Sequence, residues 1–228
     1  MSDRMHVQSF EVLAKWIRDE YAGNRSIFGI PESLFFSPSD RTKRLSSTLF
    51  DQPLGTPFGP AAGPHTQLSQ NIISAWLTGG RFIELKTVQI MDELDIPRPC
   101  IDMTDEGYNV EWSQELKLEQ SVREYRHAWA LIHVLHHVLG WDAIPVGTIF
   151  NMSVGYNLEG IRTDRMQRFM DEMTRPSPEV ESLRAVIRRF FPQSAVIPIP
   201  PCMTDNVTLS TMHGCPPDEI EQLVKELN

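Results

Sequence analysis

Stretches typical of buried strands alternate along this chain with stretches typical of amphipathic helices. The strand patterns occupy residues 81–88, 147–154 and 206–210, and helical patterns fill the intervals and follow the last strand. This order is typical of a parallel sheet, because each parallel strand must return to the same edge through a crossover, which is usually a helix. The sequence therefore predicts an α/β fold built on a parallel sheet.

The ends of several predicted elements can be placed from local signals. Thr66 is predicted to cap a helix over residues 67–78, and Thr163 is predicted to cap a later helix. Two short strands joined by a turn are expected over residues 45–63, and residues 89–112 are expected to be irregular. The other predicted helices cover residues 10–21, residues 112–139, a segment that begins at Pro178, and the last residues after Pro217.

The residues that follow the strands favour a (β/α)8 TIM barrel over a doubly wound sheet. No G-x-G-x-x-G pattern follows the first strand, so the fingerprint of dinucleotide-binding sheets is missing. Small or polar clusters stand there instead, namely AAGPHT, KT, NMSVGYN and LSTMHGCPP, and barrel enzymes place their chemistry at these carboxyl ends. A whole barrel needs about 250 residues, so we expect a partial barrel that is truncated about halfway.

Charge and composition exclude several classes of partner. The formal net charge is −9, with 21 basic and 30 acidic residues, so neither a nucleic acid nor an anionic membrane is an expected partner. No apolar run could cross a bilayer, and the first residues lack the apolar core of a secretory signal, so we expect a cytoplasmic protein. The three cysteines form no CxxC pair, so this stretch is not expected to hold zinc or an iron–sulfur cluster.

Four motifs could carry chemistry, and each also has a plain structural explanation. The TPFGPAAG loop could bring backbone close to a flat ligand, or it could be a tight turn. Lys86 in ELKT could place a positive charge beside an anionic ligand, or it could be a surface lysine. Asn109 could bind a planar polar ligand or lie in a turn. Cys215 is better explained as a reactive thiol near a helix N-terminus, because a Gly-Cys-Pro-Pro turn is a poor site for an inert buried cysteine.

Three histidines share one face of the helix predicted over residues 112–139. His133, His136 and His137 have the i, i+3, i+4 spacing that metal ligands can have. No carboxylate stands at a suitable offset on the same helix. We therefore expect no metal site.

Several blocks of the sequence, taken in order, resemble the motifs of known flavoproteins. TPFGPAAG, ELKTV, GYN, FNMSVGYN and TLSTMHGCPP resemble the ordered motifs of the dihydroorotate dehydrogenase superfamily, whose members are FMN-binding barrels. A narrower resemblance links SIFGIPES, GPAAGPHTQL, WLTGGRFIELKTVQI, IFNMSVGYNLEGI and TLSTMHGCPPDEIE to the N-terminal part of the selenate reductase subunit family of the YgfK type. This resemblance runs from about residue 25 to the end of the chain.

The superfamily resemblance also implies roles for particular residues. Thr208 stands where the superfamily has asparagine, so the usual pyrimidine substrate is not implied. The implied flavin-binding residues are Ala61, Ala62, Gly63, Lys86, Thr87 and Asn151, the implied substrate-binding residues are Asn109, Thr208 and Ser210, and Cys215 matches an active-site cysteine that gives or takes a proton.

The resemblance implies a place for the chain in a larger enzyme. We expect a helical extension over residues 1–44 and the first part of the barrel over residues 45–228, inactive by itself. The whole protein would use FMN for redox chemistry on a small polar substrate, with FAD, NAD(P)H and 4Fe-4S clusters in downstream domains and partner subunits in an electron-transfer complex. The alternative is a barrel that has lost catalysis and serves as a docking domain of such a complex.

Overall fold

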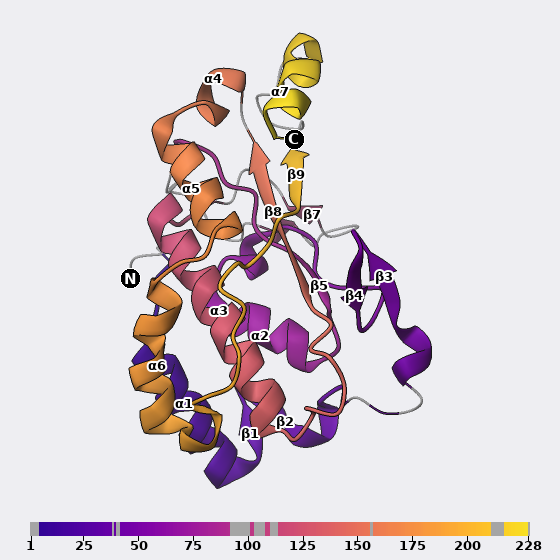
Figure 1. Ribbon diagram of the computed structural model, residues 1–228, viewed down its shortest axis with the longest axis vertical. Coiled ribbons are helices and arrows are strands. Elements are labelled where there is room, and N and C mark those ends of the chain that lie inside the picture. The colour runs from indigo at the N-terminus through magenta and orange to yellow at the C-terminus, as the bar shows by residue number, and fades with distance from the viewer. Residues whose placement is uncertain are drawn as a thin grey trace.

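A three-stranded sheet lies at the centre of the molecule, in a computed structural model that describes residues 5–37, 39, 42–91, 101–102, 108–109, 114–155, 157–210 and 217–227. The strands are β5 (Phe82–Glu84), β8 (Ile149–Gly155) and β9 (Val207–Ser210), in the order β5–β8–β9 (Figure 1). Both pairs are parallel. The predicted parallel α/β arrangement is therefore confirmed.

An extended segment at residues 58–60 continues the sheet beyond β5. The carbonyl of Phe58 accepts a hydrogen bond from the amide of Phe82 at 3.3 Å, and the carbonyl of Pro60 accepts one from the amide of Glu84 at 3.2 Å. The pairing advances in the same direction on both segments, as in a parallel pair. Four parallel segments thus lie side by side in chain order, as successive barrel strands do. Within the described residues they form an open sheet and not a closed barrel.

Helices cover one face of this sheet. The longest, α3 (Leu118–Val138), packs Trp129 against Phe150 of β8, with ring centroids 5.0 Å apart. It also contacts α2, α5 and α6, and Figure 1 shows α5 and α6 on the same side of the sheet as α3. Apolar burial holds these layers together. The other helices are α1 (Phe10–Asn24), α2 (Ser69–Leu77), α4 (Leu158–Ile161), α5 (Asp164–Thr174), α6 (Glu179–Phe190) and α7 (Ile220–Leu227).

A short antiparallel hairpin lies on the other side of the sheet. It consists of β3 (Ser47–Leu49) and β4 (Gln52–Leu54), which confirms the two strands expected in this region. The turn residues Phe50 and Asp51 both have positive φ, at 51° and 57°, as a two-residue turn of type I′ requires. The Phe50 ring lies 6.4 Å from that of Phe82, so the hairpin tip faces β5.

The hairpin is also tied to a segment far away in the sequence. The Gln52 side-chain amide donates a hydrogen bond of 2.8 Å to the carboxylate of Asp205, just before β9. The remaining short elements are the antiparallel pairs β1 (Ser26–Ile27) with β2 (Ile30–Pro31) and β6 (Ile101–Asp102) with β7 (Tyr108–Asn109), and the 3-10 turns η1 (Glu32–Leu34), η2 (Thr42–Leu45), η3 (Pro64–Thr66), η4 (Pro192–Ser194) and η5 (Pro217–Glu219).

The predicted cap at Thr66 is wrong, whereas the cap at Thr163 is confirmed. The Thr66 hydroxyl closes η3 by bonding to Gly63, so α2 starts three residues later than Thr66. The amide of Ser69 is satisfied from another helix, by the carboxylate of Glu124 at 2.7 Å. A tertiary contact thus replaces the local cap. Thr163 accepts from the amide of Met166 at 3.3 Å, as predicted.

The N-terminal helix packs on the body of the domain. Glu11 of α1 forms an ion pair of 2.6 Å with Arg189 of α6, and the Arg18 guanidinium lies over the ring of Phe190. The domain boundary expected after residue 44 stays a prediction. None of the helices in the described ranges is long and apolar enough to cross a membrane.

Candidate active site

The central strands present an apolar face to the helices and a polar face to the other side. Along β8, Phe150, Met152 and Val154 belong to the hydrophobic core. Successive side chains of a strand point to opposite faces, so Asn151 and Ser153 lie on the face away from the helices. In a barrel this face is the interior, and its carboxyl end is where chemistry is found.

Three side chains, one from each strand, form a hydrogen-bonded row on the polar face. The amide nitrogen of Asn151 lies 2.6 Å from the Glu84 carboxylate and 2.6 Å from the Thr208 hydroxyl. Thr208 in turn donates to Glu84. Burial raises the pKa of the Glu84 carboxyl above its ordinary value, and the hydrogen bonds from Asn151 and Thr208 partly oppose the rise. The row thus holds a carboxyl group whose proton affinity is increased.

Asn151 and Thr208 were among the predicted site residues, but Glu84 and Ser153 were missed. The sequence signal that could have identified Glu84 and Ser153 is the period of two along a strand, which puts alternate side chains on the same face. In FIELK it places Glu84 on the same face as Lys86, and in NMS it places Ser153 with Asn151.

Replacing Asn151 by aspartate tests this row. Asn151→Asp puts a second carboxylate about 3 Å from that of Glu84, and two carboxylates so close cannot both ionise without a large cost. We expect the melting temperature to fall by several degrees at pH 7.5 and to recover at pH 5, where one carboxyl is protonated. Differential scanning fluorimetry at both pH values measures this. In a Glu84→Gln background the same substitution should cost much less, and an equal cost in both backgrounds would contradict the predicted repulsion.

Lys86 lies just past the carboxyl end of β5, and two hydrogen bonds to its backbone fix its position. Its amide donates to the carbonyl of Thr66 at 3.4 Å, and its carbonyl accepts from the Tyr125 hydroxyl at 3.3 Å. Burial raises the pKa of Tyr125, so the phenol keeps its proton and can donate. Only 6% of Lys86 is exposed. It is therefore a buried lysine and not a surface one.

Small and hydroxyl-bearing residues gather at the same end of the sheet. The Thr87 and Ser153 hydroxyls lie 2.8 Å apart. A side chain at Gly155 would meet Thr87 at 3.2 Å and Ser210 at 3.5 Å, so a larger residue there would push these side chains apart. The structure thus brings the predicted Thr87 and Ser210 together.

The small-residue loop runs beside this cluster. The Pro60 carbonyl accepts from the amide of Glu84, and the Thr66 carbonyl of η3 accepts from the amide of Lys86, so residues 61–63 lie between two hydrogen bonds to β5 and the residues just after it. Ala61 is exposed and Gly63 is buried. Side chains this small leave the backbone open to a flat molecule. Together with a buried cation and several hydroxyls, this donor set fits the polar edge of a planar cofactor such as a flavin.

Two predicted residues cannot be placed in the cluster. Cys215 lies outside the described residues, and Asn109 is described only as a backbone member of β7. Two histidines of α3 have different partners: His133 Nδ1 lies 2.8 Å from the Trp129 carbonyl, and His137 Nδ1 lies 2.7 Å from Asp142. No cluster of three metal-binding side chains occurs in the part of the chain that the structure describes.

Parallel strands that follow one another, with polar groups gathered at their carboxyl ends, are arranged as in part of a TIM barrel. The match to a family is specific. Residues 28–227 match the family described as "Oxidoreductase YgfK, N-terminal TIM-barrel domain", and the chain belongs to this family.

Two curated relatives have sequences similar to this one. The proteins named "Putative oxidoreductase YgfK" in Escherichia coli (strain K12) and in Escherichia coli O157:H7 are each 46% identical over 244 aligned positions, which include 99% of this chain. The chain spans only 23% of the length of either relative. Among solved structures, a ligand-free type DHODH from Eimeria tenella matches 82% of this chain and 53% of its own, with 18% identity and a TM-score of 0.41. A match at that level says nothing about the residues of the site.

Proposed function

We propose that this domain binds FMN and supports redox chemistry on a small polar substrate. The observation that carries the proposal is Lys86, a buried lysine at the carboxyl end of β5, anchored next to a loop of small residues. A buried cation in a water-poor site stabilises negative charge far better than one in solvent. Family membership supports oxidoreductase chemistry in general.

The same geometry suggests which residues would hold the cofactor. Backbone amides of residues 61–63 would face the ring, Lys86 would lie near its anionic edge, and Thr87 would add a hydroxyl. Asn151 would act indirectly, because its amide nitrogen is engaged by Glu84 and Thr208. When bound, a flavin supplies transfer of a hydride or of electrons.

The substrate would lie over the open side of this cluster. Ser210 and Asn109 are proposed to orient it, and Cys215 to donate or accept a proton. Thr208 is proposed to contact the substrate while its hydroxyl stays bonded within the row of Glu84 and Asn151. Glu84 adds a carboxyl group whose raised pKa would let it hold a proton close to the Thr208 side chain.

We also propose the setting of the domain. It would act in the cytoplasm within a longer protein, whose other domains would bind FAD, NAD(P)H and 4Fe-4S clusters and pass electrons to or from this site. This longer protein would join partner subunits in an electron-transfer complex. The length of the curated relatives leaves room for such domains.

Lys86→Ala in the full-length protein tests the flavin site. Loss of the cation should reduce FMN content severalfold or lower the reduction potential of the bound flavin, because a positive charge favours the anionic reduced form. FMN released by denaturation and measured by chromatography gives the occupancy, and spectroelectrochemistry gives the potential. The exposed Lys15→Ala is the matched control and should change neither.

The second candidate is a docking domain without a cofactor. It is favoured by Thr208, whose hydroxyl is already engaged by Asn151. Wild-type full-length protein that contains FAD but no FMN would support this candidate and sink the flavin proposal for this domain.

A further inference from the structure

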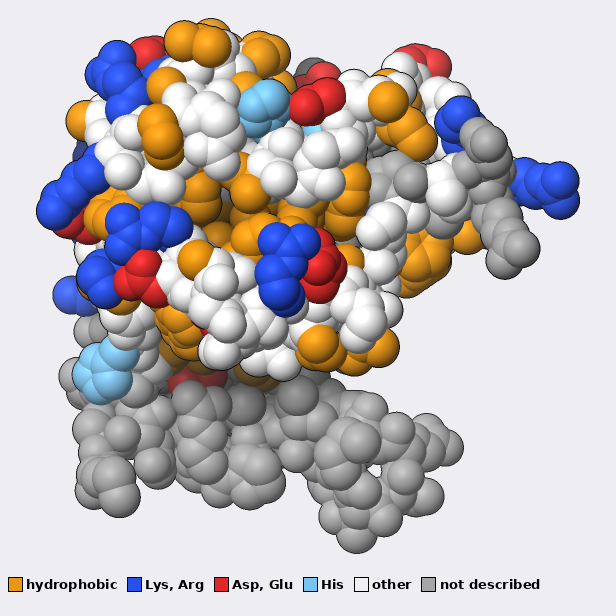
Figure 2. Space-filling view, turned by 90° about the horizontal axis from the view of Figure 1, so that it is seen from below, with side chains coloured by type: hydrophobic (Ala, Val, Ile, Leu, Met, Phe, Trp, Pro, Cys, Tyr) orange, Lys and Arg blue, Asp and Glu red, His pale blue; other side chains and the backbone are white. Residues whose placement is uncertain are grey.

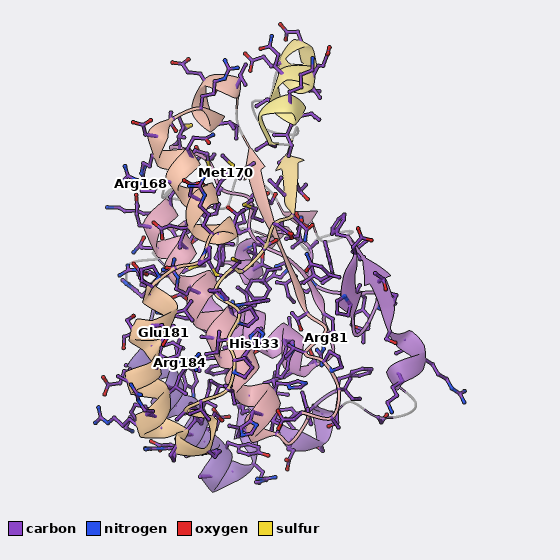
Figure 3. All side chains as sticks on the ribbon, viewed as in Figure 1. Arg81, His133, Arg168, Met170, Glu181 and Arg184 are labelled. Carbon is purple, nitrogen blue, oxygen red and sulfur yellow. The ribbon has the colours of Figure 1, made fainter. Side chains whose placement is uncertain are left out.

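A cavity lies at the opposite end of the sheet from the candidate active site. It has a volume of about 230 Å³ and is formed by the β3–β4 hairpin, η2, the segment before β8, and two side chains from the body of the domain, Arg81 and His136. Arg81 stands at the amino end of β5 (Figure 3). Figure 2 views the molecule from this end and shows a hollow with hydrophobic side chains at its floor. Nothing in the proposed redox chemistry uses this cavity.

Arg81 gives the cavity a buried positive charge. The residue is 4% exposed, and its Nη1 donates to the carbonyls of Trp76 and Gly80 at 2.5 and 3.0 Å. Those two bonds leave the other guanidinium nitrogens free, and within the described ranges no carboxylate pairs with Arg81. Burial lowers its pKa to about 10, so the side chain still carries its charge at neutral pH. A buried charge without a counterion is costly.

His136 adds a second polar side chain, and one of its two ring nitrogens lacks a partner among the described residues. It is 6% exposed, and its Nε2 is buried with no hydrogen-bond partner in the described structure. Its Nδ1, on the other side of the ring, lies 3.9 Å from Asp142. His136 and Arg81 both line the cavity.

The rest of the cavity wall is mainly apolar. Its apolar members include Phe36, Leu54, Ile144, Pro145 and Val146. A free inorganic anion would leave these surfaces unused, whereas a molecule with one anionic end and a compact apolar body would cover both parts. Ligand pockets commonly combine an apolar lining with a few polar groups that fix orientation.

We propose that this cavity binds a small organic monocarboxylate, with its carboxylate on Arg81 and its apolar body against the hairpin. A planar carboxylate can accept two parallel hydrogen bonds from a guanidinium. Because β5 and β8 both begin at this cavity and end at the candidate active site, the ligand would stabilise the strands that carry Lys86 and Asn151. The site is independent of the proposed flavin chemistry.

Benzoate serves as the probe, with benzamide as its uncharged counterpart, in calorimetric titrations of the full-length protein. We expect benzoate to bind at least tenfold more tightly than benzamide, and Arg81→Met to abolish that difference. Arg175→Met, an exposed arginine on the surface, is the control and should bind like wild type. Equal affinity for the two probes, no binding of benzoate up to 10 mM, or unchanged benzoate affinity in Arg81→Met would each overturn the proposal.

Two further measurements on wild-type protein keep the test decisive if Arg81→Met does not fold. The anomalous signal of 4-bromobenzoate in crystals should place the bromine beside Leu54 and Val146; a bromine elsewhere would refute the site. Phenylacetate, a carboxylate with an apolar body, should compete with benzoate for the cavity. Inorganic phosphate should compete at least tenfold more weakly than phenylacetate. Equal competition by phosphate would show that the apolar wall contributes nothing and that the ligand class is wrong.

Discussion

Gly59→Ala is expected to detach the segment at residues 58–60 from the sheet. A Cβ at this position would lie 1.6 Å from the carbonyl oxygen of Phe82, which is part of the β5 backbone and cannot rotate away. The hydrogen bonds from Phe82 and Glu84 to this segment would have to break. We expect a loss of at least about 3 kcal/mol of stability, at the upper end of what overpacking costs when it moves backbone. Hydrogen exchange of the full-length protein, measured by mass spectrometry, should show faster exchange of the β5 amides.

The matched control is Gly23→Ala. Gly23 lies in α1, and an added Cβ there meets nothing within 4 Å. Alanine is a better helix former than glycine by up to about 1 kcal/mol, so this variant should be as stable as wild type or slightly more stable. Unchanged exchange of the β5 amides in Gly59→Ala would show that the segment is not packed as described.

The second large effect concerns acid stability and His133. This histidine lies inside the helical layer (Figure 3), its Nδ1–H donates to the Trp129 carbonyl, and its ring packs edge-on against Trp129 at 4.6 Å. Burial lowers its pKa from 6.5 to about 4. The folded state therefore resists protonation, so the stability from neutral His133 is fully present above pH 6.5 and is lost as the pH falls towards 4. The loss amounts to roughly 3 kcal/mol, from 1.36 kcal/mol per pKa unit.

His133→Phe keeps an aromatic ring against Trp129 and removes the titrating group. Chemical unfolding at pH 7 and pH 4.5 should show a smaller loss of stability in this variant than in wild type. The comparison cancels groups that titrate in both proteins, such as Glu84 and Glu124, whose raised pKa values act in the opposite direction. His65→Gln, at an exposed position, should keep the wild-type slope. An identical slope in His133→Phe would contradict the prediction.

The sequence was sufficient to predict elements whose signals are local. Helical periodicity predicted α1, α3, α5 and α6, because each buries an apolar stripe, and a stretch typical of a buried strand predicted β8. Where tertiary contacts decide, the predictions were wrong or incomplete. The start of α2 depends on Glu124, which is 55 residues away from Ser69. The sequence next to the helix end contains no signal of such a distant partner.

The candidate site shows the same division. Lys86 and Asn151 stood in recognisable motifs, and the structure places both at the polar face. Glu84 was in the same motif as Lys86 and was passed over, because an acid in a strand reads as a surface residue until its neighbours are known. The cavity around Arg81 could not be predicted, since its walls come from stretches far apart in the sequence that only the folded chain brings together.

The two-faced sheet has a consequence for how the domain tolerates change. Along β8, residues that pack in the core and residues that face the candidate site alternate one by one. Neighbouring positions are therefore constrained by different requirements, packing for one and polar chemistry for the next. Substitutions at Phe150, Met152 and Val154 alter the packing under the helices, whereas those at Asn151 and Ser153 alter the polar surface. Because the two sets of side chains point to opposite faces of the sheet, the chemistry of the polar face can be varied, in a natural lineage or in a designed library, without rebuilding the core beneath it.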